Sequence, residues 1–264
     1  MITRALEKPV RTSLIDLVFP GDTNHHGTLF GGTALAHMDK VAFITAARHG
    51  HVGFVTASCE RIDFKAPVFL GQLTEAVGTV ERVGRTSMGV RVELYAEDLL
   101  SGERHLCTQG QFNMVAIRPK DQPDYVLPPL PEVTEEPADA GPPVLRMVEL
   151  VLPGMTNATK TLYGGHALSM MGKAATIAAS RHCRAAVLMA SSRQMDFDGP
   201  IHEGEAAELV ARVRQVGRSS MTIQVELWGE ALLSGARRRC AEGEFVMVAV
   251  DDANRPVKVP PLYP

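Results

Sequence analysis

The chain has little cysteine and no long apolar run, and both features narrow what it can be. Its 264 residues include only four cysteines, and none forms a Cys-x-x-Cys pair: Cys59, Cys107, Cys183 and Cys240. Sparse cysteine predicts reduced thiols and a cytoplasmic protein. No segment approaches the roughly 20 apolar residues of a membrane span. The first residues, MITRALEKPVRTS, lack the apolar core of a signal peptide. We therefore expect no membrane partner.

Other classes of protein lack their signatures as well. The net charge of −3 provides no general field for nucleic acid. The chain has no Gly-rich phosphate loop, no Gly-x-Ser-x-Gly elbow and no convincing Ser-His-Asp order. His25-His26 is the most metal-like pair, but no Cys or acid cluster has ligand spacing. We expect surface histidines, no metal and no bound cofactor.

An internal repeat dominates the sequence. The segment TLFGGTALAHMDK, residues 28–40, returns as TLYGGHALSMMGK, residues 161–173. Adding 133 to a residue number moves from the first copy to the second from about Leu17 to Ala116. Each copy has the length of a domain, so the chain predicts two domains that arose by duplication. One chemical difference stands out, because Asp39 in the first copy is Gly172 in the second.

Proline-rich segments follow each copy. We expect a first domain at 1–117, a proline- and acid-rich linker at 118–146, a second domain at 147–251 and a proline-rich tail at 252–264. VLPPLP in the linker is echoed by VPPLYP at the C-terminus. Each tail either packs along its own domain or is a plain spacer.

One copy predicts an α+β arrangement. A strand at Leu14–Phe19 precedes a polar loop, and a buried helix is expected at Gly31–His49 with Gly50 as its stop. Four β-like runs follow, at residues 52–64, 73–83, 88–96 and 104–117. One long helix wrapped by an antiparallel sheet is the simplest arrangement of these elements.

These blocks together resemble the hotdog fold. DTNHHGTLFGGTALAHMDKVA (22–42), ARHGHVGFVTASCERIDFKAP (47–67) and VGRTSMGVRVEL (83–94) resemble the acyl-CoA thioesterases of that superfamily. The tandem arrangement is similar to that of cytosolic acyl-CoA hydrolases with two hotdog domains in one chain. The resemblance covers nearly all of both copies, apart from the linker and the ends.

The resemblance implies hydrolysis of acyl-CoA at composite sites between two paired hotdog domains, here as a pseudo-dimer within one chain. One domain gives the Gly-Gly helix start and the acid, and its partner gives a loop Asn. The implied catalytic site therefore holds Gly31, Gly32 and Asp39 with Asn157. The other site would hold Gly164, Gly165 and Gly172 with Asn24, and it would lack its acid.

The residues themselves leave alternatives open. The glycines either present free N–H groups to an oxyanion or simply make a tight turn. Asp39 is either an ion-pair partner of Lys40 or of an Arg in the other copy, or a tuned acid that acts as general base or as nucleophile. Asn157 either orients water or makes an Asx-turn. Asn24 either helps to bind ligand or only makes the equivalent Asx-turn.

Two further expectations concern binding. Arg85 and Ser87, with Arg218 and Ser220 in the second copy, lie in turns that suit the phosphates of coenzyme A or are ordinary hairpins. Similar hotdog pairs assemble in threes, which implies a homotrimer of this chain.

Two other functions compete with hydrolysis. If Asp39 is structural, the chain is a non-catalytic protein that binds or senses acyl-CoA. A hotdog dehydratase would need a catalytic histidine, for which His37 is the candidate, but the second copy has Ser169 there.

Overall fold

The computed structural model describes residues 10–131 and 144–262, which fold into two compact units. Unit 1 contains one long helix, α1 (Gly31–Gly50), and a five-stranded sheet. Its strands are β1 (Arg11–Leu17), β2 (Gly53–Cys59), β3 (Leu73–Val83), β4 (Ser87–Glu97) and β5 (Arg104–Ile117). A short 3-10 turn, Pro20–Asp22, follows β1.

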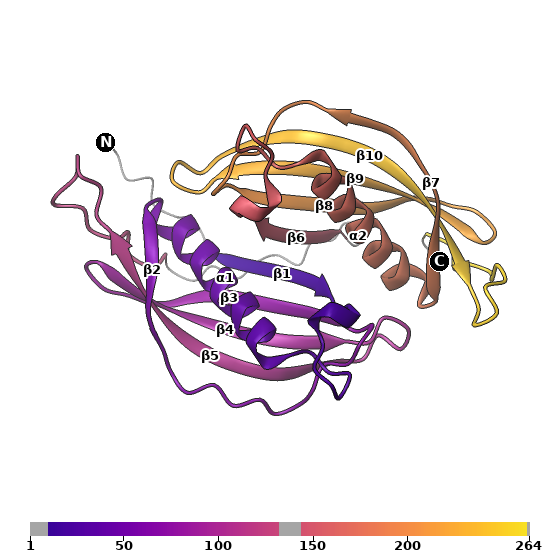
Figure 1. Cartoon of the computed structure of the whole chain (residues 1–264), viewed down its shortest axis with the longest axis horizontal. Coiled ribbons are helices and arrows are strands. Elements are labelled where there is room, and N and C mark those ends of the chain that lie inside the picture. Colours follow the sequence, from indigo (N-terminus) through magenta and orange to yellow (C-terminus); the bar gives the residue numbers. More distant parts are fainter. Residues whose placement is uncertain (1–9, 132–143, 263–264) are drawn as a thin grey trace. The chain divides into compact units, whose positions relative to one another are not determined.

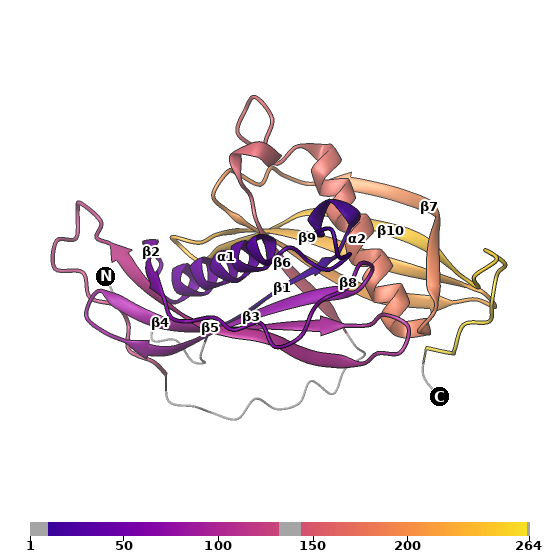
Figure 2. The ribbon, with the colours of Figure 1, turned by 60° about the horizontal axis from the view of Figure 1, so that its bottom comes forward.

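Unit 2 repeats this order of elements. It contains α2 (Gly164–Cys183), a 3-10 turn at Pro153–Met155 and a second five-stranded sheet. Its strands are β6 (Leu145–Leu150), β7 (Ala186–Phe197), β8 (Ala206–Val216), β9 (Ser220–Ala231) and β10 (Ala236–Val250). Figures 1 and 2 show each helix lying along one face of the sheet of its own unit. The predicted α+β class and the two-domain arrangement are confirmed.

The sheets are antiparallel throughout, with the strand order β1-β3-β4-β5-β2 in unit 1 and β6-β8-β9-β10-β7 in unit 2. Buried and partly buried residues alternate along much of β4, because one face of the sheet packs on the helix. The order leaves β2 at one edge of its sheet, and most of its side chains are exposed.

The helix α1 packs on its sheet over most of its length. Met38, Val41 and Ile44 are completely buried. Close approach depends on Gly78 of β3, since a Cβ atom there would collide with the Thr45 hydroxyl. The predicted buried helix is therefore correct.

The end of that helix differs from the prediction. Gly50 is the last residue of the helix. The helix ends at His51, whose φ of 51° is left-handed. A Cβ atom on Gly50 would lie 2.9 Å from Phe54 and 3.0 Å from Leu127. Gly50 is thus required by packing and not by a left-handed backbone.

Some strand limits also differ. The first strand is Arg11–Leu17 and not Leu14–Phe19, because Phe19 instead caps the turn that begins at Pro20. The run predicted at 52–64 ends as a strand at Cys59, whereas its counterpart β7 continues to Phe197. Leu145 and Arg146, expected in the linker, belong to β6.

The described part of each proline-rich segment packs on its own unit. Leu127 is 4 % exposed and donates its N–H to the Arg85 carbonyl at 3.0 Å, and His49 contacts the Pro128 carbonyl at 2.8 Å. Val259 is 3 % exposed and donates to the Arg218 carbonyl at 3.0 Å. Packing was therefore the correct alternative here, while linker residues 132–143 lie outside the described residues.

Within the described part of the chain, no helix combines the length and hydropathy that a membrane span requires.

Candidate active site

The first backbone N–H groups of α1 have no hydrogen-bond acceptor among the described residues. Phe30 caps α1 without a side-chain hydrogen bond, and the first N–H with a helical acceptor is that of Ala34, which donates to the Phe30 carbonyl at 3.1 Å. The N–H groups of Gly31 and Gly32 have no acceptor among the described residues. They therefore form a ready site for a developing negative charge.

The two glycines at this start have different surroundings. A Cβ atom on Gly32 would lie 2.5 Å from the Phe30 ring, whereas one on Gly31 meets nothing within 4 Å. Gly164 and Gly165 behave in the same way, with Tyr163 as the neighbouring ring. The first glycine of each pair thus has no packing requirement in this chain, and its missing side chain leaves the helix start open to a ligand.

Asp39 is exposed and paired, in contrast to the buried acid that its apolar helix suggests. Its carboxylate accepts a hydrogen bond of 2.6 Å from the Thr56 hydroxyl on the edge strand β2. No ion pair to Asp39 is present among the described residues, and Lys40 is not its partner. Thr56 is a site residue that the sequence reasoning missed.

The second unit has lost both members of this pair. Gly172 stands at the position of Asp39, and Met189 at that of Thr56. A Cβ atom on Gly172 would lie 3.0 Å from the Met189 methyl group. The hydrogen bond between Thr56 and the Asp39 carboxylate in unit 1 is therefore replaced in unit 2 by an apolar neighbourhood of Gly172 and Met189. The repeat offset alone could have revealed this paired change.

The two loop asparagines both make the turn that was their simpler interpretation. Asn157 Oδ1 accepts the N–H groups of Thr159 at 3.0 Å and Thr161 at 3.1 Å. Asn24 Oδ1 accepts the N–H of His26 at 2.9 Å.

Their amide nitrogens differ. Asn24 Nδ2 donates to the Thr28 hydroxyl at 2.9 Å, but Asn157 Nδ2 has no acceptor among the described residues. Asn157 is also exposed. Its amide can therefore donate to a bound molecule without breaking its turn.

Helix geometry bears on which donors can act together with Asp39. Asp39 follows Gly31 by eight residues in a continuous helix, and a rise of 1.5 Å per residue separates their backbones by about 12 Å. A base that acts on a carbonyl through one water lies at most about 10 Å from the donor to that carbonyl, since three contacts of about 3 Å and one C=O bond separate them. Donors at another helix start therefore suit a carbonyl beside Asp39 better than the Gly31 N–H of its own unit.

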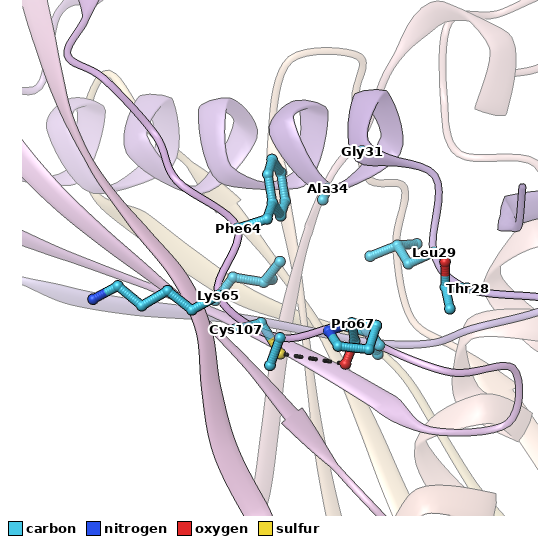
Figure 3. Close-up of a pocket in the computed structure, with 11 residues that line it drawn as sticks. Thr28, Leu29, Gly31, Ala34, Phe64, Lys65, Pro67 and Cys107 are labelled. Carbon is cyan, nitrogen blue, oxygen red and sulfur yellow. Dashed lines mark hydrogen bonds between the residues drawn. The ribbon is translucent and has the colours of Figure 1, made fainter. Parts of the chain in front are cut away.

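A cavity of about 320 Å³ opens beside the start of α1 (Figure 3). Phe64, Leu29 and Pro67 contribute apolar walls, and Gly31 and Ala34 bring the helix backbone to its rim. The Lys65 amine points away from it. Its volume is at the lower end of small-molecule sites, which run from about 300 Å³. Asp39 does not line it.

The predicted phosphate-binding turns have matching geometry. Gly84 donates to the Ser87 carbonyl at 2.7 Å, and Gly217 donates to the Ser220 carbonyl at 2.7 Å. Arg85 and Arg218 are exposed, and neither guanidinium has a hydrogen-bond or ion-pair partner among the described residues. Both are available for an anion.

Metal binding finds no support among the residues that the structure describes, which contain no group of three or more His, Cys, Asp or Glu that could hold an ion. His25 and His26 are exposed. The four cysteines are free, and burial raises the pKa of the Cys107 and Cys240 thiols.

Comparison with known proteins agrees with this architecture. A family model described as the thioesterase superfamily matches residues 26–103 and 159–252. The crystal structure of an acyl-CoA hydrolase from Agrobacterium tumefaciens superposes with a TM-score of 0.86 at 50 % identity, covering 97 % of this chain and 100 % of the other.

Two curated relatives extend the comparison. An uncharacterized acyl-CoA thioester hydrolase of Bacillus subtilis, YkhA, is 40 % identical over 49 % of this chain and 73 % of its own length. The cytosolic acyl coenzyme A thioester hydrolase of Rattus norvegicus is 23 % identical over 93 % of this chain and 76 % of its own length.

The chain therefore belongs to the thioesterase superfamily, with two tandem hotdog domains. The predicted family, the fold and the enzyme class, a thioester hydrolase, are confirmed.

Proposed function

We propose that this protein hydrolyses acyl-CoA to a free carboxylic acid and coenzyme A. The names of its relatives supply the substrate class. The observation that carries the proposal is the exposed Asp39 carboxylate, which the Thr56 hydroxyl holds in place. A carboxylate fixed in this way can deprotonate water or attack the thioester directly.

The catalytic site in this proposal is composite. Asp39 comes from unit 1, and Asn157 comes from unit 2. Because Asp39 lies about two turns from its own helix start, we assign the oxyanion donors to Gly164 and Gly165, which follow Asn157 in the same unit. This assignment replaces the expected role of Gly31 and Gly32 beside Asp39.

Exposed apolar side chains support the pairing of hotdog domains through this face. Phe30, Leu35 and Val55 of unit 1 are 57 %, 39 % and 51 % exposed. Their counterparts in unit 2, Tyr163, Leu168 and Leu188, are 58 %, 43 % and 51 % exposed. Exposed large apolar side chains at matching positions of both units favour a partner domain there.

The second composite site would be degenerate. It would combine Gly31, Gly32 and Asn24 with Gly172, and it would have neither the carboxylate nor the threonine that positions it. Asn24, whose amide is already engaged by Thr28, would keep a binding or structural role.

Other parts of the proposal concern binding and assembly. Arg85 and Arg218, with Ser87 and Ser220, would bind the phosphates of coenzyme A. The reaction would need no metal or bound cofactor, since a carboxylate, an amide and backbone donors supply the chemistry. We place the enzyme in the cytoplasm, as the name of its rat relative suggests, and expect three chains per particle, which sedimentation analysis would check.

The test is a thiol-release assay with acyl-CoA of short, medium and long chain. Asp39→Asn keeps the shape of the side chain but removes the charge, and we expect hydrolysis to fall at least about a hundredfold. Asp124→Asn is the matched control, because Asp124 is exposed and has no partner among the described residues. An active Asp39→Asn enzyme would refute the proposed mechanism. Tight acyl-CoA binding without hydrolysis by the wild type would establish a binding protein instead.

A further inference from the structure

The C-terminal tail of unit 2 is held in place by backbone hydrogen bonds. Val257 donates to the Ala249 carbonyl at 2.9 Å, and Val259 donates to the Arg218 carbonyl at 3.0 Å. His182 contacts the Pro260 carbonyl at 3.1 Å. Val259 is buried. This segment therefore holds one position against the turn that joins β8 to β9.

A cavity of about 540 Å³, widely open to solvent, lies between that turn and the tail. The end of β8 contributes Arg214, Gln215 and Val216, the turn contributes Gly217, and the tail contributes Lys258, Val259, Pro261 and Leu262. No carboxylate is among the lining residues. The volume is within the range of small-molecule sites, about 300–1,000 Å³.

Two cations at this cavity have no counter-ion among the described residues. Lys258 is exposed and has no partner among the described residues. Arg214 is exposed and donates only through Nε, to the Gln224 side chain. Glu242, the nearest acid in this network, accepts from Gln224 and is paired with Arg239 at 2.6 Å. The terminal N–H groups of Arg214 and the Lys258 amine remain available.

Unit 1 shows that the cations are not needed to hold a tail. Its tail makes the same backbone contact, from Leu127 to the Arg85 carbonyl. Yet the position of Arg214 is Glu81 there, which is paired with Arg91 at 2.9 Å. Val126, the residue before Leu127, stands where unit 2 has Lys258. The positive cavity is therefore particular to unit 2.

We propose that this cavity binds the phosphate group of a phosphorylated small molecule. Two unpaired cations suit a multiply charged anion, and the Gln215 side chain can add a further donor. Val216, Pro261 and Leu262 form an apolar wall for the organic part of the ligand. The phosphate can belong to coenzyme A or to a separate metabolite, because both would make the same contacts with Arg214 and Lys258.

The experiment measures binding of inorganic pyrophosphate and of coenzyme A by calorimetry at low ionic strength. The double variant Arg214→Glu/Lys258→Val gives unit 2 the residues of unit 1. Arg11→Glu/Lys120→Val changes the net charge equally at exposed residues elsewhere. We expect pyrophosphate affinity to fall at least about tenfold in the first variant and to stay unchanged in the second. Equal binding in the first variant, equal losses in both, or no binding by the wild type would overturn the proposal.

A second readout identifies the source of the phosphate. If the double variant also binds coenzyme A more weakly and raises KM for acyl-CoA at constant kcat, the phosphate belongs to the substrate. If only pyrophosphate binding is lost, the site takes a separate ligand. The binding measurement does not use turnover, so it remains decisive even if the proposed hydrolysis fails.

Discussion

The hydroxyl of Thr56 is expected to position Asp39 for catalysis. Its 2.6 Å hydrogen bond to the carboxylate comes from a neighbouring strand and fixes the side chain across the gap between α1 and β2. Thr56→Val removes the hydroxyl but keeps the branched shape. Thr56→Ser keeps the hydroxyl and removes the methyl group. The two variants therefore separate the hydrogen bond from packing.

The size of the effect follows from the bond. Hydrogen bonds to charged groups contribute about 1.5–3 kcal/mol, and exposure of both residues favours the lower end. A loss of about 1.5 kcal/mol in the transition state lowers kcat/KM roughly tenfold. Since valine suits an edge strand as well as threonine does, the change in Tm should be small.

The assay is release of free coenzyme A, followed with a thiol reagent at several acyl-CoA concentrations. We expect Thr56→Val to lose activity roughly tenfold and Thr56→Ser to retain most of it. Wild-type kcat/KM in Thr56→Val would refute the reasoning. So would an equal loss in both variants, because the methyl group and not the hydroxyl would then matter.

Three other predictions follow from the same geometry. Gly164→Ala should lower kcat about tenfold or more while Gly31→Ala leaves it unchanged; the reverse result in the same assay would return the oxyanion site to α1. Gly172→Asp combined with Met189→Thr should add activity to an Asp39→Asn enzyme, whereas Gly172→Asp alone should add less, because the carboxylate would lack its donor. Burial lowers the pKa of His49 from its ordinary value of 6.5, so the unfolded chain binds more protons than the folded chain just below pH 6.5. The free energy of unfolding should therefore decrease as the pH is lowered through this range. Urea denaturation at pH 7.5 and 5.5 should show that His49→Gln weakens this dependence, and an identical pH dependence in the variant would contradict it.

Much of the fold could be read from the sequence because its signals are local. The limits of β3 and β5 match the predicted runs, since alternation and turn residues bracket them. The strand ends next to Phe19 and Cys59 were wrong, because hydrogen bonding between strands and not propensity decides where pairing stops. Gly50 was assigned to a helix stop for a sound local reason, but Phe54 and Leu127 supply its real constraint.

The site was predicted less completely. Asp39 and Asn157 could be proposed from the repeat and the resemblance, yet their surroundings could not. Thr56 approaches Asp39 from 17 residues away through the packing of β2 beside α1. The availability of the Asn157 amide depends on which turn contacts its oxygen makes.

The sequence by itself determined the duplication, the long buried helices, the antiparallel strands and the loss of the acid at Gly172. These follow from periodicity and from the constant offset between copies, which do not depend on three-dimensional contacts. Only the tertiary structure decided that Asp39 is exposed and held by Thr56, that the proline-rich tails pack on their units, and that Arg214 and Lys258 share a cavity. Each of these depends on residues far apart in the chain, which only the packing of strands, helix and tail brings together.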